Sequence, residues 1–417
     1  MKTSRGKTAS LLKVLEISRA LGASVDLESL LGLIVRRGME LLDSERATVF
    51  IYDKPANELY SRIAAGEGEI RAPADRGIAG ATVLNNATIN VPDAYADSRF
   101  NPEVDRKTGF RTRNILSLPL RDHEGELVGV LQVLNRRGGP FDDEDVWLGE
   151  TLAAQAGVVL QRAILIDHYV RKQQMERDMG IAREIQQGLL PSRMPSIDGF
   201  DIAGFTSPAD ETGGDVFDFM QLDDGRWMVI VADASGHGIG PALVIAQTRA
   251  MLRAVCSLGV GLEQTLQTAN DLLSDDLNDA RFVTCFFGML DGAESRIDYA
   301  SAGHGPMLFY DARNDSFSQA SATALPLGVM GGMKYDEVVH HSLQNGDFVV
   351  IATDGFFEAV NPAGEPFGLD RMMESLRRDR NLGASEMIAN LHNAVAQFAV
   401  SPKQADDLTI VVIKRNS

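Results

Sequence analysis

The sequence predicts a multidomain α+β protein, and three observations lead to this fold class. The chain has 417 residues, of which 44% are hydrophobic, enough for more than one packed domain. Two regions, residues 25–147 and 191–417, contain many short apolar runs bounded by turn residues, a pattern typical of strands. Residues 148–190 between them have the apolar spacing of a single long helix.

The first strand-rich region follows a predicted N-terminal helix, residues 1–24. A further helical stretch, LESLLGLIVRRGMELL, opens the region. The strand-like runs after it are RATVFIYD, LYSRIAA, NATINVPD, ILSLPLRD and LVGVLQVLN. Helix, strands and a closing helix predict a small α+β domain.

The connecting segment carries the seam of a coiled coil. Its apolar or small residues alternate in steps of four and three: Leu152, Ala156, Val159, Ala163, Ile166 and Val170. The seam becomes irregular over residues 171–178, resumes at Met179 and ends before Pro191. One interpretation is a helix that packs only on its neighbours. We expect instead the stalk of a parallel homodimer, with the irregular segment as a site of conformational change.

The second strand-rich region alternates between strands and helices. Its strand-like runs include RWMVIVAD, FVTCFFGMLD, DFVVIATD and LTIVVIKR, and its helical stretches include PALVIAQTRAMLRAVCS and SEMIANLHNAVAQFA. Many strands with helices set outside them predict a layered α/β sandwich.

Composition excludes several classes of protein. The formal net charge of −18 argues against a general nucleic-acid binder, because phosphate contacts require Lys and Arg. The two cysteines, Cys256 and Cys285, lie in apolar runs, so neither a disulfide framework nor a cysteine-rich zinc site is expected. No apolar run approaches the length of a membrane span, about 18 residues. The N-terminus lacks the apolar core of a signal peptide, so we expect a cytoplasmic protein.

Aspartates mark the ends of several predicted strands in the second region. They are Asp215 in GGDVFDF, Asp233 after an apolar run, Asp354 in IATDGFF, and the pair Asp406 and Asp407 before the last strand. Clustered carboxylates raise one another's pKa unless cations bind them. Mg²⁺ and Mn²⁺ prefer oxygen ligands, and two such ions about 3.5–4 Å apart can activate a water for attack at phosphorus. Alternatively, each aspartate serves only a turn.

A series of motifs runs through residues 180–412. They are AREIQQGLLP, ADETGGDVFDF, VADASGHG, FVTCFFGMLD, YASAGHGPMLF, LPLGV, NGDFVVIATDGFFEAVN, GEPFG and DDLTIVVIK. In this order they resemble the SpoIIE/RsbU branch of the PPM metal-dependent serine/threonine phosphatases. The resemblance implies an αββα sandwich with two Mn²⁺ or Mg²⁺ ions between its sheets.

The same resemblance implies a catalytic metal-binding set. Its members are Asp215, Asp233, Ala234 through its carbonyl oxygen, Asp354 and Asp406. Asp233 would bridge the ions, and Asp406 is favoured over Asp407 because the family ligand is the first residue of that pair. A water activated by the two ions would attack phosphoserine or phosphothreonine in line, without a covalent intermediate.

The sequence does not identify the general acid. His237 lies four residues after Asp233, which differs from the spacing in relatives whose histidine protonates the leaving group. His237 and His304 both lie in glycine-rich loops, which a histidine can also simply shape. His340 and His341 lie in a strand-like run and are expected to be structural.

Three motifs in residues 25–165 resemble a second family. They are VPDAYADSRFNPEVDRKTGFRTRNILSLPL, GVLQVLNRR and GGPFDDEDV, and they resemble a GAF domain of the cyclic-nucleotide-phosphodiesterase type. The lid signature of that family reads Asn135-Arg136, Phe141 and Asp145 here, with Val146 in place of the last acid. We expect an Arg136–Asp145 ion pair to hold the lid. The resemblance implies a small-molecule ligand such as a cyclic nucleotide, or dimerisation alone.

Together the two resemblances imply a GAF-regulated, metal-dependent protein phosphatase of bacterial-type partner-switching signalling, and the helical seam predicts that it is dimeric. The homodimer would form through the linker helix and the GAF domain. The resemblance implies a phosphoserine substrate on a STAS-type anti-sigma-factor antagonist. Two alternatives remain: a non-catalytic ligand-sensing scaffold, and a GAF-linked nucleotidyl cyclase, which also uses paired aspartates.

Overall fold

The chain folds as two units, residues 1–174 and 175–417. The computed structural model describes residues 16–17, 19–23, 26–61, 70–277, 281–400 and 404–416. The predicted helix of residues 1–24 lies largely outside the described residues.

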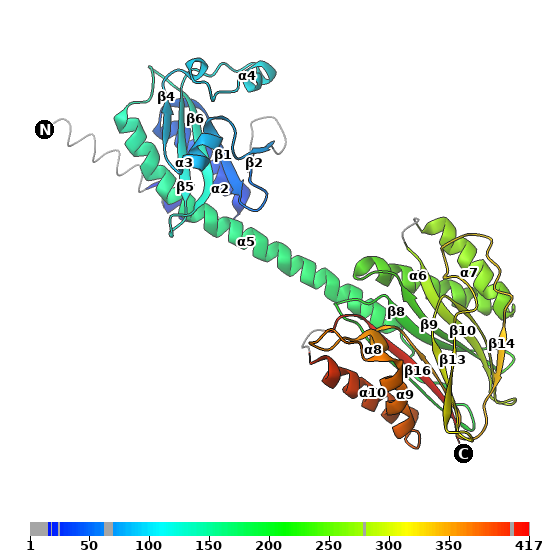
Figure 1. The fold of residues 1–417 in the computed structure, drawn as a ribbon. Coiled ribbons are helices and arrows are strands. Elements are labelled where there is room, and N and C mark those ends of the chain that lie inside the picture. Colours follow the sequence, from blue (N-terminus) through cyan, green and yellow to red (C-terminus); the bar gives the residue numbers. More distant parts are fainter. Residues whose placement is uncertain are drawn as a thin grey trace. The chain divides into compact units, whose positions relative to one another are not determined.

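The first unit is built on one antiparallel sheet of six strands (Figure 1). The strand order is β3 (Ile70–Pro73), β2 (Glu58–Ser61), β1 (Ser44–Asp53), β6 (Leu127–Arg136), β5 (Ile115–Arg121) and β4 (Ile89–Val91). Helices α2 (Leu27–Leu41) and α5 (Asp143–Leu189) share a core with one face of this sheet. Helix α3 (Gly77–Asn85) packs on the other face. The predicted α+β domain is confirmed.

Short helices in this unit were not predicted. Helix α3 has nine residues, and α4 (Glu103–Thr108) has six. Such lengths give little room for a recognisable helical period. By contrast, α2 has both signals of a helix. The Asp26 side chain caps its first turn by accepting a hydrogen bond from Ser29 N at 2.8 Å, and Leu30, Leu31 and Ile34 form its buried stripe.

Helix α5 runs from Asp143 to Leu189 without a break, so it includes the segment that looked irregular in sequence. Its predicted seam is divided between two environments. Leu152 and Ala156 are fully buried in the core of the first unit, whereas Ile166 and Val170 are 43% and 47% exposed. The first half of the heptad pattern therefore reflects packing on the chain's own sheet, as the alternative interpretation had it. The second half is free to meet a partner.

The second unit contains two antiparallel sheets of five strands each. One, the β9 sheet, has the order β14 (Val339–Ser342), β11 (Arg296–Ala302), β10 (Val283–Asp291), β9 (Trp227–Ala234) and β8 (Asp215–Gln221). The other, the β16 sheet, has the order β13 (Ser316–Ala320), β12 (Met307–Asp311), β15 (Phe348–Ala352), β16 (Leu408–Arg415) and β7 (Phe200–Ser207). Strands β12 and β13 were not predicted. Strand β13 is mostly polar and exposed, whereas β12 is a buried run of only five residues.

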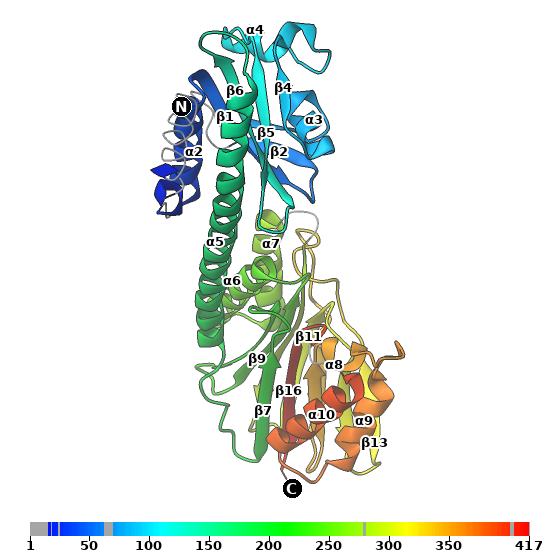
Figure 2. The ribbon, with the colours of Figure 1, turned by 90° about the vertical axis from the view of Figure 1, so that its left-hand side faces the viewer.

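Side chains on these strands alternate between two buried layers, as the two-residue period of a strand requires. Val229 and Val231 of β9 pack between the sheets against Ile351 and Val411. The intervening residues of β9 pack under α6 (Ile239–Cys256) and α7 (Leu262–Asp276). Helices α9 (Gly368–Arg378) and α10 (Ala384–Ala399) cover the outer face of the β16 sheet (Figures 1 and 2). The predicted αββα sandwich is confirmed.

Both cysteines are free and buried, consistent with the expectation of no disulfide framework. Over the described parts of the chain, no helix has the length and apolar character that crossing a membrane requires.

Candidate active site

Strand register brings the first two aspartates together. In the ladder between β8 and β9, Asp215 lies directly opposite Asp233. Opposed residues of an antiparallel pair point to the same face, with β-carbons about 4.5–5.5 Å apart. That face is the interior of the sandwich, because Phe217 and Phe219 occupy the next inward positions of β8. Asp215 is 6% exposed, so its carboxyl group is held inside the protein.

The β16 sheet supplies the other acids at the same end of the sandwich. Asp354 follows β15 by two residues and directly precedes α8 (Gly355–Glu358). Asp406 and Asp407 directly precede β16, which pairs with β15 through Ala352 and Ile410. The two sheets are linked here by Thr353, whose Oγ1 donates a hydrogen bond to Asp215 Oδ2 at 2.7 Å.

Glycines allow the loops that carry these acids to approach one another. A β-carbon on Gly214 would lie 2.7 Å from the Ala234 carbonyl oxygen, and one on Gly355 would lie 2.0 Å from the carbonyl oxygen of Asp407. Both distances are shorter than a carbon–oxygen contact permits, so GGD and TDG require glycine at these positions. The GGD loop therefore packs against the end of β9, and the TDG turn packs against the start of β16.

Asp406 and Asp407 have different surroundings. Asp407 Oδ1 accepts a hydrogen bond from Ala209 N at 2.7 Å, and Oδ2 accepts one from Gly214 N at 2.6 Å. Its carboxylate therefore fixes the loop before Asp215. Asp406 is exposed, and its charge contributes to the raised pKa of Asp233 and of Asp354, so it lies near both. This arrangement leaves Asp406 the freer of the two for a ligand role.

The electrostatics of the centre are those of uncompensated acids. Burial, followed by the charge of Asp354, raises the pKa of Asp233 to about 7. Burial and the charge of Asp233 raise the pKa of Asp215 well above its ordinary value. Burial also raises the pKa of Asp354, as does the charge of Asp406. Within the described ranges, no Lys or Arg forms an ion pair with any of these side chains.

Metal binding is the chemistry that this donor set fits. All the side chains are carboxylates, the ligands that Mg²⁺ and Mn²⁺ prefer, and a bound cation would remove their mutual repulsion. Ala234 lies next to Asp233, beneath Gly214. As the described residues stand, no three or more His, Cys, Asp or Glu side chains are grouped so that they could hold an ion.

Helix α5 makes a contact with this centre that sequence reasoning missed. Gln186 Oε1 accepts a hydrogen bond from Gly213 N at 3.0 Å, and Gln186 Nε2 donates one to Gly213 O at 2.5 Å. The side-chain amide of Gln186 thus hydrogen-bonds to both backbone polar groups of Gly213, two residues before Asp215. The motif AREIQQGLLP contains this glutamine, but nothing in its spacing indicated which residue it would meet.

The histidines lie in different surroundings. The His237 side chain is 92% exposed, and its Nδ1 is 3.9 Å from Asp210 Oδ2. His304 is buried, which removes it from contact with a leaving group in solution. His341 packs on Phe309, with ring centroids 4.3 Å apart.

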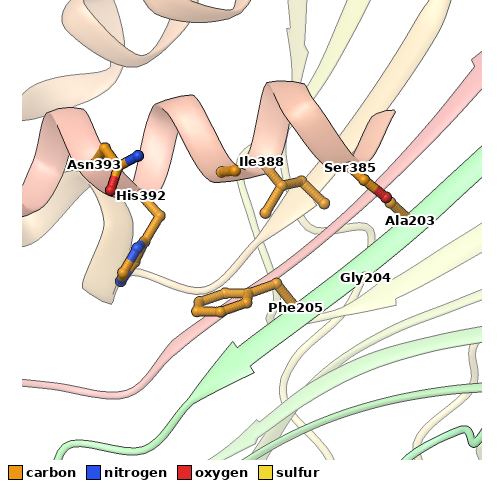
Figure 3. A pocket seen from close by; sticks show the side chains of 8 residues that line it. Ala203, Gly204, Phe205, Ser385, Ile388, His392 and Asn393 are labelled. Carbon is orange, nitrogen blue, oxygen red and sulfur yellow. The ribbon is translucent and has the colours of Figure 1, made fainter. Parts of the chain in front are cut away.

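A groove of about 290 Å³ lies elsewhere on the second unit, between β7 and α10. Figure 3 shows Phe205, Ile388 and His392 beside it. Its lining shares no residue with the acidic centre, so it does not mark the site of the chemistry.

The predicted lid of the first unit is held by its own residues. Arg136 Nε is 2.5 Å from Asp145 Oδ2, so the expected ion pair is present. Asn135 is fully buried, and its Oδ1 accepts a hydrogen bond from Arg113 N at 2.6 Å. These polar groups are satisfied within the lid, which fits a structural role.

Comparison with known proteins gives two family matches. Residues 26–160 match the GAF domain, and residues 223–416 match Stage II sporulation protein E (SpoIIE). The second match includes Asp233, Asp354 and Asp406, whereas Asp215 lies just before it.

Individual relatives agree with these matches. The chain is 26% identical to phosphoserine phosphatase RsbU of Bacillus subtilis over 246 residues, which are 58% of this chain and 72% of that protein. It is 31% identical to a probable 3′,5′-cyclic phosphodiesterase, pde-5, of Caenorhabditis elegans over 167 residues, 37% of this chain and 23% of that protein.

The fold also has a solved counterpart. The SiaA-PP2C domain of Pseudomonas aeruginosa superposes with a TM-score of 0.52 at 19% identity, covering 58% of this chain and 98% of that domain. The chain is thus a GAF domain followed by a SpoIIE-type phosphatase domain, a serine/threonine phosphatase.

Proposed function

We propose that the chain is a metal-dependent phosphoserine and phosphothreonine protein phosphatase regulated by its GAF domain. Its ions, two Mg²⁺ or Mn²⁺, would be held by Asp215, Asp233, Asp354, Asp406 and the Ala234 carbonyl oxygen. The observation that supports this most strongly is the convergence of carboxylates from both sheets, with no Lys or Arg among the described residues paired with them.

Bound ions would lower the pKa of a water and neutralise negative charge on the phosphoryl group. The chain's own residues prepare this site. Thr353 fixes the orientation of the Asp215 carboxyl group by its hydrogen bond. Asp407 holds the GGD loop through two backbone N–H groups. Asp406 is exposed, so a phosphoryl group on a protein surface can reach this side of the centre.

The substrate class follows from the relative. RsbU is named a phosphoserine phosphatase, and its match covers more than half of this chain. A phosphoserine on a STAS-type anti-sigma-factor antagonist is therefore the substrate that we propose, in a partner-switching pathway.

Regulation would run through α5. Beyond the core of the first unit, this helix exposes large apolar side chains at neighbouring positions on one side: Leu165, Ile166, Tyr169 and Val170. Such a stripe favours pairing with a second copy of the helix. The same helix ends on the GGD loop through Gln186. A GAF ligand such as a cyclic nucleotide would then change activity by changing this helix or its pairing.

A turnover assay on the full chain tests the proposal. Phosphate release from a phosphoserine-containing STAS domain is measured with Mn²⁺, with Mg²⁺ and with EDTA. We expect release only with metal, and its loss in Asp233→Asn. A parallel incubation with nucleoside triphosphates should yield no cyclic nucleotide.

The other outcomes identify the alternatives. Cyclic nucleotide formation would indicate a cyclase, and the absence of any turnover from a folded, metal-binding chain would indicate a scaffold. Light scattering of wild type and of the double variant Ile166→Glu, Val170→Glu tests the dimer. We expect only the variant to be monomeric.

A further inference from the structure

His304 lies in a turn that joins the two sheets of the phosphatase domain. The turn connects β11 of the β9 sheet to β12 of the β16 sheet, and His304 in it is 3% exposed. A histidine so fully buried is unusual unless its ring nitrogens are used, because neutral imidazole still has a donor and an acceptor to satisfy.

The ring contacts one strand end from each sheet. Its Nδ1 is 3.4 Å from Thr284 Oγ1, and the backbone of Ala352 lies close enough to the ring to influence its pKa. Thr284 lies directly opposite Asp233 in the ladder between β9 and β10. Ala352 lies two residues before Asp354. His304 therefore lies between the supports of two proposed metal ligands, one on each sheet.

The protonation state of the ring suits this position. Burial lowers the pKa of His304 to about 4, so the imidazole is neutral at pH 7 and adds no charge beside the acids. Among the described residues, Nε2 has no hydrogen-bond partner. A buried polar atom left unpaired costs about 1–3 kcal/mol, and an apolar side chain of similar size would avoid that cost. This combination indicates a role beyond packing.

We propose that His304 is a positioning residue of the metal centre, one that fixes the ends of β10 and β15 so that Asp233 and Asp354 are held for metal binding. The inference rests on the proposed metal-dependent function. His304 acts through Thr284 and Ala352, and it touches neither substrate nor the reacting atoms. Residues that orient metal ligands in this way typically affect metal affinity by about 10-fold to 100-fold.

Three variants separate positioning from packing. His304→Leu removes both ring nitrogens at similar volume, and His304→Asn retains an N–H donor on a short side chain. His341→Leu is the matched control. His341 is a partly buried histidine of the same domain; it lies on the edge strand β14 and packs on Phe309. Mn²⁺ affinity is measured by titration calorimetry on the full chain, and metal-free stability by urea unfolding.

We expect His304→Leu to raise the Mn²⁺ dissociation constant about 10-fold or more. His304→Asn should restore most of the affinity, and His341→Leu should bind as wild type does even where its stability falls. Wild-type affinity in His304→Leu, or an equal loss in His341→Leu, would overturn the proposal.

A second variant covers the case in which His304→Leu does not fold. Thr284→Val removes the hydroxyl group that meets the ring, and the proposal then requires weaker Mn²⁺ binding. Unchanged affinity in a folded Thr284→Val would refute it. Failure of the proposed function looks different, because wild type itself would then bind no Mn²⁺.

Discussion

Strand β8 carries a buried aspartate on each face, and the two aspartates have opposite charges around them. Asp218, on the helix-covered face, is 1% exposed, and its Oδ2 lies 2.8 Å from Arg249 Nε and 2.6 Å from Arg253 Nη1. Asp215, on the inner face of the same strand, is 6% exposed and meets a threonine hydroxyl group and other carboxyl groups. The two residues are three positions apart in sequence, yet their electrostatic surroundings have opposite signs.

This difference distinguishes a structural carboxylate from one available to a ligand. A buried charge is tolerated when a countercharge accompanies it, as at Asp218. At Asp215 the compensation has to come from outside the chain, since the neighbouring groups add negative charge. Exchanging or removing these groups should therefore have separable effects on catalysis and on stability.

The largest effect is expected from Asp215→Asn. Loss of a metal ligand should lower kcat/KM roughly a thousandfold, since metal ions contribute several kcal/mol to such barriers. The metal-free variant should remain at least as stable as wild type, because the amide removes one repelling charge. Steady-state kinetics measure the loss of activity, and urea unfolding in EDTA measures the stability of the metal-free variant. A variant that unfolds but retains its turnover per folded molecule would reverse our assignment.

Asp218→Ala should show the opposite behaviour. Removing the carboxylate leaves two arginines unpaired, and breaking a buried pair costs about 3–5 kcal/mol. Because Arg253 is 34% exposed, solvent screens part of this loss, and we expect about 2 kcal/mol. Urea unfolding measures it, and Mn²⁺ affinity serves as the control. A large loss of metal affinity with unchanged stability would contradict the comparison.

The metal-free protein should become more stable as pH falls from about 8 to about 5. The pKa of Asp233 is raised to about 7 in the folded state from 3.8, so the folded chain takes up a proton that the unfolded chain does not. The raised pKa values of Asp215 and Asp354 act in the same direction. Urea midpoints in EDTA at both pH values test this. Asp233→Asn should have a flatter profile, and stability that rises with pH would count against the acidic centre.

A smaller effect is expected from Gln186→Leu. The variant loses two hydrogen bonds to Gly213, and each such bond contributes about 1–1.5 kcal/mol to stability. If the contact between Gln186 and Gly213 positions the GGD loop, kcat should fall roughly tenfold. Gln187→Leu, at the exposed neighbouring position, is the control and should be unaffected. Equal rates in the two variants would limit the contact to a passive role.

The sequence predicted where the aspartates lie along the strands but not how they come together. The apolar run before Asp233 indicated that an aspartate ends a buried strand. Convergence of Asp215 with Asp354 depends on the packing of two sheets, which no local pattern reports. The Thr353 hydroxyl group and Gln186 were missed for the same reason, because both reach across elements that are distant in sequence.

The α5 seam illustrates a further limit. A repeat of four and three residues shows that one side of a helix is apolar, but not what covers it. Leu152 and Ala156 are covered by the GAF sheet, whereas Ile166 and Val170 are exposed. Only the second group is left to support a dimer.

Calorimetric titration of the metal-free full chain with Mn²⁺ tests the central claim most directly. If the carboxylates of the two sheets form one cation site, wild type should bind about two ions saturably. Asp233→Asn should lose this binding, and Asp218→Asn should retain it. Absence of saturable binding to wild type, or equal binding to Asp233→Asn, would contradict the account.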